Sequence, residues 1–252
     1  MRCVSRGSVP TDRSDTLRHD GPVVTADWML SPVMEDYLKT IYHLQRRDGE
    51  RVSTSAIAEE LDVTAPSVTS MVGKLEERGL VEREKYAGVR LTPDGERVAL
   101  EVIRHHRLLE VYLTEHLDYD WSEVHEEADR LEHHISEAFE ERMAAALAEP
   151  TVDPHGAPIP GADLEPPVSR VEGDLTDVVE GDRVIVEEVR DEEPAVLEYL
   201  ADHGVRPQVE LEIIEVAPFG MVTVQPADRS ETVSIPERIA PHVKIAPVKT
   251  DE

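Results

Sequence analysis

The side chains best suited to chemistry lie in one short segment. His125, Asp129, Glu132 and His133 stand at offsets 0, 4, 7 and 8 along the chain. On a single helix these offsets place all four side chains on one face. Imidazole nitrogen combined with carboxylate oxygen is a donor set typical of divalent transition metals. The segment is therefore a candidate metal site.

A second pair of such residues lies upstream, where His106 and Glu110 are four residues apart. Two antiparallel helices would bring both groups to one volume. The alternative interpretation is a solvated acidic face in a protein with 54 carboxylates and 11 histidines. The adjacent pairs His105–His106 and His133–His134 favour metal binding. His105 and His134 themselves point about 100° away from their neighbours on an ideal helix, so they are not expected to be ligands.

Two helices must position these side chains. Residues 93–117 form an unusually apolar stretch, which predicts a long helix with more than one packing partner. Asp120, followed by Glu123 three residues on, has the pattern of a helix cap. A second helix is therefore predicted from Asp120 to about Ala148.

The preceding segment has the order of a winged helix-turn-helix. Apolar spacing predicts helices over residues 32–45, 53–61 and 65–78, with Ser53 as a cap and Pro66 in a first turn. Two short extended pieces, 80–83 and 89–92, then predict a hairpin. Helix, helix, recognition-type helix and hairpin is the order of that DNA-binding unit.

The exposed side of the third helix and the hairpin are the candidate DNA surface. The alternative is an ordinary polar surface, but short hydroxyls and cations in this pattern favour contacts with phosphates and thymine methyls. The candidate residues are Thr64, Pro66, Ser67, Thr69, Ser70 and Lys74 on the helix, with Arg83, Lys85 and Arg90 in the wing. Because one such module has few cations, a homodimer on a palindromic operator in double-stranded DNA is expected.

The remainder of the chain changes in character. Six prolines interrupt residues 150–167, and alternating apolar residues with one short helix follow from 173 to 248. We predict an α+β multidomain protein. Its parts are a disordered extension (1–28), a winged helix-turn-helix (29–92), metal-binding and dimerisation helices (93–149), a Pro-rich linker (150–172) and a small β-barrel (173–248).

The charge distribution agrees with this division. The net charge is −28, but residues 1–105 hold 15 basic and 18 acidic residues, whereas residues 106–252 hold 11 and 36. The acid thus lies outside the predicted DNA-binding part. Widely spread carboxylates and only five lysines indicate adaptation to high salt, where charge repulsion is screened; an ordinary acidic cytosolic protein is the alternative. With one cysteine and no long apolar run, we expect a cytoplasmic location, no disulfide framework and no membrane partner.

Several short stretches, in order over residues 31–165, resemble one family. The chain is similar to the diphtheria toxin repressor / manganese transport regulator family of metal-dependent repressors. The matching stretches are MEDYLKTIY (34–42), APSVT (65–69), LTPDG (91–95), HRLLE (106–110), VHEEA (124–128), Glu132-His133 and PHGAPIPG (154–161). The C-terminal part resembles the family's SH3-like (FeoA-type) domain.

The resemblance implies two neighbouring metal positions. One would be formed by His106, Glu110 and His125, with Glu192 or Glu193 as a possible further carboxylate. The activating position would be formed by Asp36, Asp129, Glu132 and His133. The family's iron-responding members have Met and Cys at the places of Asp36 and Asp129, so hard oxygen donors favour Mn²⁺ here, with Fe²⁺ as the alternative. Lys39 stands where the manganese type has a ligating Glu.

The resemblance therefore implies a repressor that controls manganese or iron homeostasis and binds its operator when loaded with Mn²⁺ or Fe²⁺. Two other classes of function are weighed against it. A metal-dependent hydrolase would need a nucleophile motif, a phosphate loop or HExxH, and the sequence has none of these. We therefore do not expect an enzyme or an organic cofactor. The remaining alternative is a winged-helix regulator that senses a small organic ligand and binds no metal.

Overall fold

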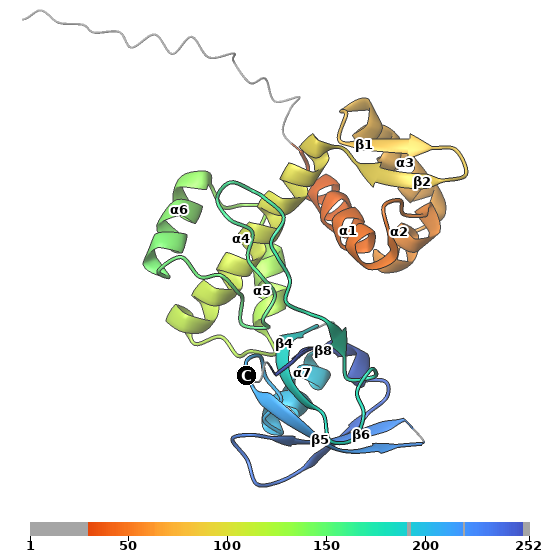
Figure 1. Ribbon diagram of the computed structural model, residues 1–252. Helices are drawn as coiled ribbons and strands as arrows, with labels where there is room; N and C mark the ends of the chain where they lie inside the picture. The colour runs from red at the N-terminus through yellow and green to blue at the C-terminus, as the bar shows by residue number, and fades with distance from the viewer. Residues whose placement is uncertain (1–29, 191–192, 219, 249–252) are drawn as a thin grey trace, which may run out of the picture. The chain divides into compact units, whose positions relative to one another are not determined.

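The computed structural model describes residues 30–190, 193–218 and 220–248 (Figure 1). The predicted extension over residues 1–28 lies outside the described residues. Within the described ranges, no helix combines the length and the apolar character that crossing a membrane would need.

The first elements form the predicted winged helix. They are α1 (Pro32–Asp48), α2 (Thr54–Glu60), α3 (Ala65–Glu77), β1 (Val81–Glu84) and β2 (Gly88–Leu91). Each helix begins at a hydroxyl cap, because the side chains of Ser31, Ser53 and Thr64 accept a hydrogen bond from the backbone N–H three residues on. The strands pair antiparallel, from Val81 opposite Leu91 to Glu84 opposite Gly88.

α4 (Pro93–Leu117) is the helix on which the other helices pack. It has the predicted bounds, and it contacts α1 as well as α5 (Val124–Leu131) and α6 (Glu137–Ala146). Apolar side chains from α4, α5 and α6 share one core. These several partners explain why α4 is apolar on more than one face.

The single helix predicted from Asp120 to Ala148 is wrong, because the structure has two helices there. Val124 opens α5 through a backbone hydrogen bond to the Asp120 carbonyl, and the Asp120 side chain is not its cap. The Glu132 carbonyl lies 3.2 Å from Nδ1 of His105, and Ser136 caps α6 by accepting from the N–H of Phe139. These two contacts stabilise a turn between the helices, so Glu132 and His133 lie just beyond α5.

The first part of the proline-rich segment packs on α4. The Arg104 guanidinium donates to the Pro160 carbonyl at 2.7 Å, and Arg107 donates to the Pro158 carbonyl. The Ile159 side chain joins the core of the helical part. Residues 150–161 are thereby fixed against the helices.

The C-terminal part is a six-stranded antiparallel sheet around one core. Its elements are β3 (Gly173–Asp174), β4 (Arg183–Val189), α7 (Pro194–Asp202), β5 (Glu210–Ala217), β6 (Met221–Pro226), β7 (Val233–Pro236), the 3-10 turn η1 (Ala240–His242) and β8 (Val243–Pro247). The strand order is β3-β8-β4-β5-β6-β7. Register shifts after Val186 and Ile213 bend the strands, and apolar residues from β4 to β8 and from α7 meet in one cluster. The sequence predicts a small β-barrel here; the structure confirms a β-rich domain, and no pairing between the end strands β3 and β7 is seen among the described residues.

We predict that Gly95→Ala lowers the melting temperature. A Cβ at Gly95 would lie 1.9 Å from the Leu80 carbonyl oxygen, because the start of α4 crosses the chain closely there. The clash should cost about 1–3 kcal/mol of unfolding free energy. Gly73→Ala is the matched control, since nothing lies within 4 Å of its Cβ position in α3, and a better helix former should add up to about 1 kcal/mol. Calorimetric melts of both variants check this, and equal melting temperatures would contradict it.

Candidate metal centre

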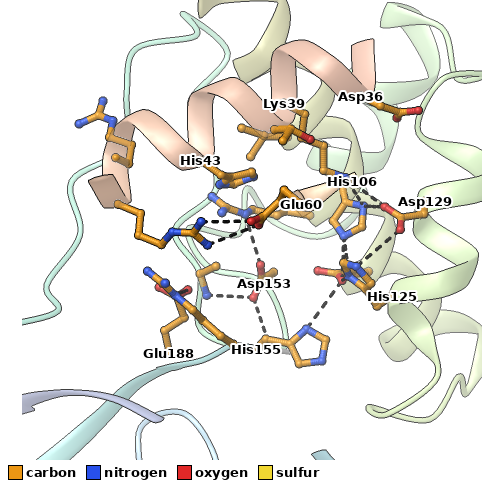
Figure 2. A pocket seen from close by; sticks show the side chains of 18 of the residues that line it. Asp36, Lys39, His43, Glu60, His106, His125, Asp129, Asp153, His155 and Glu188 are labelled. Atoms are coloured by element: carbon orange, nitrogen blue, oxygen red, sulfur yellow. Dashed lines mark hydrogen bonds and ion pairs between the residues drawn. The ribbon is translucent and has the colours of Figure 1, made fainter. Parts of the chain in front are cut away.

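The predicted ligands come together from three elements (Figure 2). Most of them line an open cleft of about 770 Å³, and Glu132 is buried beside it. α1 supplies Asp36, α4 supplies His106 and Glu110, and α5 with its following turn supplies His125, Asp129, Glu132 and His133.

The structure divides these residues differently from the two predicted positions. Among the described residues there are three groups of potential ligands, and within each group the ligand atoms lie within 4.8 Å of one another. Asp129 groups with His106 and His125, and not with the other members of the predicted activating position. The groups are His106/His125/Asp129, Asp36/Glu132/His133 and Glu110/Asp153/His155.

The His106 ring connects the groups. Its Nδ1 lies 2.6 Å from Oε2 of Glu132, and its Nε2 lies 3.0 Å from Oε1 of Glu110 and from Nδ1 of His125. Burial lowers the pKa of His106, but the charge of Glu110 and hydrogen bonds to carboxylates outweigh burial and raise that pKa well above its usual value. The ring is held ready to carry a positive charge.

The buried carboxylates stay ionised because their contacts with His106 stabilise their negative charge. Glu110 is 2% exposed and Glu132 is 1% exposed. Burial raises the pKa of each, but His106 and other hydrogen-bond donors outweigh burial, so the pKa of Glu110 falls well below its usual value and that of Glu132 is lowered. The pKa of Asp129 is lowered in the same way, through His106 and Lys39.

Lys39, which stands where the manganese type has a ligating Glu, lies within this cluster. Its Nζ lies 3.0 Å from Oδ1 of Asp129 and 2.8 Å from Oε2 of Glu132. Burial disfavours the ammonium form, yet these two carboxylates hold the pKa of Lys39 above its usual value. A cation of the chain thus lies among the predicted ligands.

The His133 ring joins α1 to the turn after α5. Its Nε2 lies 2.9 Å from Oδ1 of Asp36, and its Nδ1 lies 2.6 Å from Oε2 of Glu35. Burial raises the pKa of both carboxyls, although the His133 contact opposes this effect. Glu35 was not among the predicted residues; its place beside Asp36 at the start of a helix was the only sequence signal.

Sequence reasoning also missed Asp153 and His155. Both are buried, and Nδ1 of His155 lies 3.7 Å from Oε1 of Glu110. Burial, followed by the charge of Glu110, raises the pKa of Asp153 to about 7. The segment PHGAPIPG contains this histidine, and a histidine fixed among prolines and glycines was the available signal.

The sequence offers Glu192 or Glu193 as a possible carboxylate from the C-terminal domain. Glu192 lies outside the described residues, and Glu193 is exposed at the start of α7. Glu188 of β4 lines the cleft instead. Gly156 permits this approach, because a Cβ there would lie 2.0 Å from the Glu187 carbonyl oxygen, and the Val189 N–H donates to the His155 carbonyl at 2.8 Å.

The candidate DNA residues lie on the surface of the winged helix. The side chains of Thr64, Pro66, Ser67, Thr69, Ser70, Lys74, Arg83 and Lys85 belong to exposed residues, and Arg90 is half-buried. Arg90 is paired with Glu82 and Glu50, each at 2.7 Å, and Arg83 lies 3.3 Å from Glu76. Arg83 and Arg90 therefore already have carboxylate partners within the winged helix.

Fold and site together define a winged-helix protein with a cluster of metal-type ligands next to its first helix. Comparison with known families agrees with this class. Residues 29–89 match the iron dependent repressor N-terminal DNA binding domain, residues 92–161 match the iron dependent repressor metal binding and dimerisation domain, and residues 174–247 match the FeoA domain.

Individual relatives give the same result over most of the chain. The iron-dependent repressor IdeR of Mycobacterium tuberculosis (strain H37Rv) is 33% identical over 236 residues, covering 85% of this chain and 96% of that protein. The diphtheria toxin repressor of Corynebacterium diphtheriae is 33% identical over 190 residues, covering 72% and 84%. A solved manganese-dependent transcriptional repressor in complex with manganese has a TM-score of 0.79 and 36% identity, covering 85% of this chain and 100% of that one. This chain belongs to the diphtheria toxin repressor / manganese transport regulator family of metal-dependent repressors.

We predict that binding of a divalent cation expels a proton from His106. Because the pKa of His106 is raised, its ring is protonated at pH 7, whereas a ligating imidazole must be neutral. Metal affinity should therefore rise with pH up to the pKa of His106. Calorimetric Mn²⁺ titrations in two buffers of different protonation enthalpy count the released protons.

The variant His106→Gln should release about one proton fewer per ion bound than the parent protein. His116→Gln is the control, because His116 is an exposed histidine of the same helix that stacks on Tyr112 away from the cleft. An unchanged proton count in the His106 variant would contradict the assignment.

Proposed function

We propose that this protein is a metal-responsive DNA-binding repressor, which acts in the cytoplasm as a homodimer on a palindromic operator and controls manganese or iron homeostasis. Family membership supports this proposal, as does the fact that its relatives are iron-dependent and manganese-dependent repressors. Residues 92–161 match the family's metal binding and dimerisation domain, which supports the homodimer.

One observation carries the proposal most directly: potential metal ligands come from both the winged helix and the helices behind it. Asp36 lies on α1, which is part of the winged helix, whereas Glu132 and His133 follow α5. Ligand atoms of these three residues lie within 4.8 Å of one another. An ion held there would join the two parts of the protein.

The donor set fits Mn²⁺ or Fe²⁺. Convergent oxygen and nitrogen atoms, with no sulfur among them, suit ions of intermediate hardness, and the carboxylates at Asp36 and Asp129 favour Mn²⁺. The predicted ligands Asp36, His106, Glu110, His125, Asp129, Glu132 and His133 would hold the ion or ions, with Asp153 and His155 beside Glu110 as additional candidates. A bound ion supplies positive charge that compensates the buried carboxylates.

Contacts between α1 and the turn after α5 transmit metal binding to the DNA-binding surface. Asp36 and Glu35 contact His133 from α1, so the orientation of α1 depends on the turn after α5. α1 also packs against α2 and β2 of the winged helix. A metal ion that binds more tightly when α1 has its DNA-competent orientation shifts the population of the protein toward that orientation.

The contacts with DNA are assigned to α3 and the wing. Exposed hydroxyls on α3, with Lys74 one turn further on, offer phosphate and thymine-methyl contacts in a major groove. Because Arg83 and Arg90 are paired internally, one protomer has few free cations, and a two-fold dimer doubles the contact surface.

The cleft argues against a sensor of small organic molecules. Pockets for such ligands are predominantly apolar, whereas most residues that line this cleft are ionisable. The relatives are repressors, which supports a regulatory function over a catalytic one.

We predict that metal removal abolishes operator binding. Fluorescence anisotropy with a family-type palindromic duplex should show strong binding with Mn²⁺, loss of binding after EDTA treatment, and recovery after Mn²⁺ or anaerobic Fe²⁺ is added back. The measurement is made in molar KCl as well as in dilute salt. Equal affinity of the metal-stripped and the loaded protein would refute the proposal.

Lys74→Ala should weaken DNA binding by a similar factor at every sequence. Lys74 is exposed on α3, and loss of one phosphate contact should reduce the slope of log affinity against log salt by about one. Lys244→Ala, which removes a lysine of the C-terminal sheet, is the control. Anisotropy titrations across a salt series with operator and unrelated duplexes test both variants; an unchanged slope would reject the contact.

A further inference from the structure

Lys39 holds a position that a metal ion also requires. Its Nζ lies 3.0 Å from Oε1 and 2.8 Å from Oε2 of Glu132, and 3.0 Å from Oδ1 of Asp129. It also lies 3.4 Å from Nδ1 of His106. One ammonium group thus contacts members of two of the three ligand groups.

The carboxylate oxygens that contact the ammonium are not fully available to coordinate a divalent ion at the same time. A cation coordinated by Asp129 and Glu132 would lie a few ångströms from Nζ, and two positive charges at such a distance repel strongly where water is scarce. The Lys39 side chain is 18% exposed and lines the open cleft. It is long and flexible, so it can move toward the cleft without repacking of the core.

We propose that Lys39 is a tethered counter-cation that competes with the divalent ion for Asp129 and Glu132, and so sets the ion concentration at which this protein responds. This inference rests on the proposed metal-responsive function. It assigns Lys39 a regulatory role that differs from that of a ligand: the ammonium stabilises the buried Glu132 and the exposed Asp129, and an ion must displace it before both carboxylates can bind.

The first test replaces the competing charge. Lys39→Met keeps most of the length and volume of the side chain and removes the ammonium. The Kd for Mn²⁺, measured by competition with a fluorescent chelator, should fall about tenfold or more, whereas Lys39→Arg should stay close to the parent value. Lys244→Met is the matched control, because Lys244 is 14% exposed and pairs with Asp174 at 2.9 Å, away from the cleft. An unchanged or weaker Mn²⁺ affinity of Lys39→Met overturns the inference.

The second test uses the unaltered protein, so it does not depend on a variant that folds. The full chain is acetylated briefly with and without saturating Mn²⁺, and each of the five lysines is quantified by peptide mass spectrometry. Displacement should raise the acetylation rate of Lys39 several-fold when Mn²⁺ is bound, while Lys74, Lys85 and Lys244 stay constant. A constant or reduced rate at Lys39 overturns the inference.

The outcomes separate this inference from the proposed function. If Mn²⁺ binds and operator binding requires it, but Lys39 shows neither effect, the competition is refuted and the proposed function stands. If the unaltered protein binds no divalent ion, the proposed function is refuted and the inference with it.

Discussion

The structure depends on compensating several carboxylates that are gathered in a small buried volume. Glu110 and Glu132 are almost inaccessible to water, and buried charges of one sign are costly unless cations or hydrogen-bond donors face them. The chain supplies two cationic partners, the ammonium of Lys39 and the ring of His106, and both contact Glu132. A site with this balance is sensitive to added positive charge. That sensitivity is what a metal-responsive protein needs.

The break between α5 and α6 is part of the same arrangement. If α5 continued as one helix, the Glu132 carbonyl would be engaged within it. Instead that carbonyl faces His105, whose other ring nitrogen lies 3.0 Å from Oε2 of Glu140 in α6. Glu140 also receives the Arg104 guanidinium at 2.5 Å. His105 therefore acts on the turn that presents Glu132 and His133, which explains its burial although it belongs to none of the three ligand groups.

Local signals were sufficient for most of the elements, but not for the break between α5 and α6 or for the site's details. The cap at Ser53 and the bounds of α4 follow from residue type and apolar spacing, and the structure confirms them. The turn after Leu131, the approach of Asp153 and His155 to Glu110, and the place of Glu188 depend on contacts between distant segments. A register shift in β4 between Val186 and Glu188 interrupts the simple alternation, so no period in the sequence could assign Glu188 to the cleft.

Ion pairs within the winged helix reduce its electrostatic attraction to DNA. In the proposed mechanism the metal centre, which controls the orientation of α1, therefore contributes more to DNA affinity. Arg90 and Arg83 are paired with glutamates of the same unit, so they release few counterions when DNA approaches. In the proposed dimer on a palindromic operator, affinity then depends more on the fit of α3 hydroxyls to the two half-sites and less on net attraction. Fit of this kind depends on how α1 is held against α4 and α5, whereas simple attraction does not. A winged helix whose arginines are paired internally thus responds more completely to whatever fixes α1.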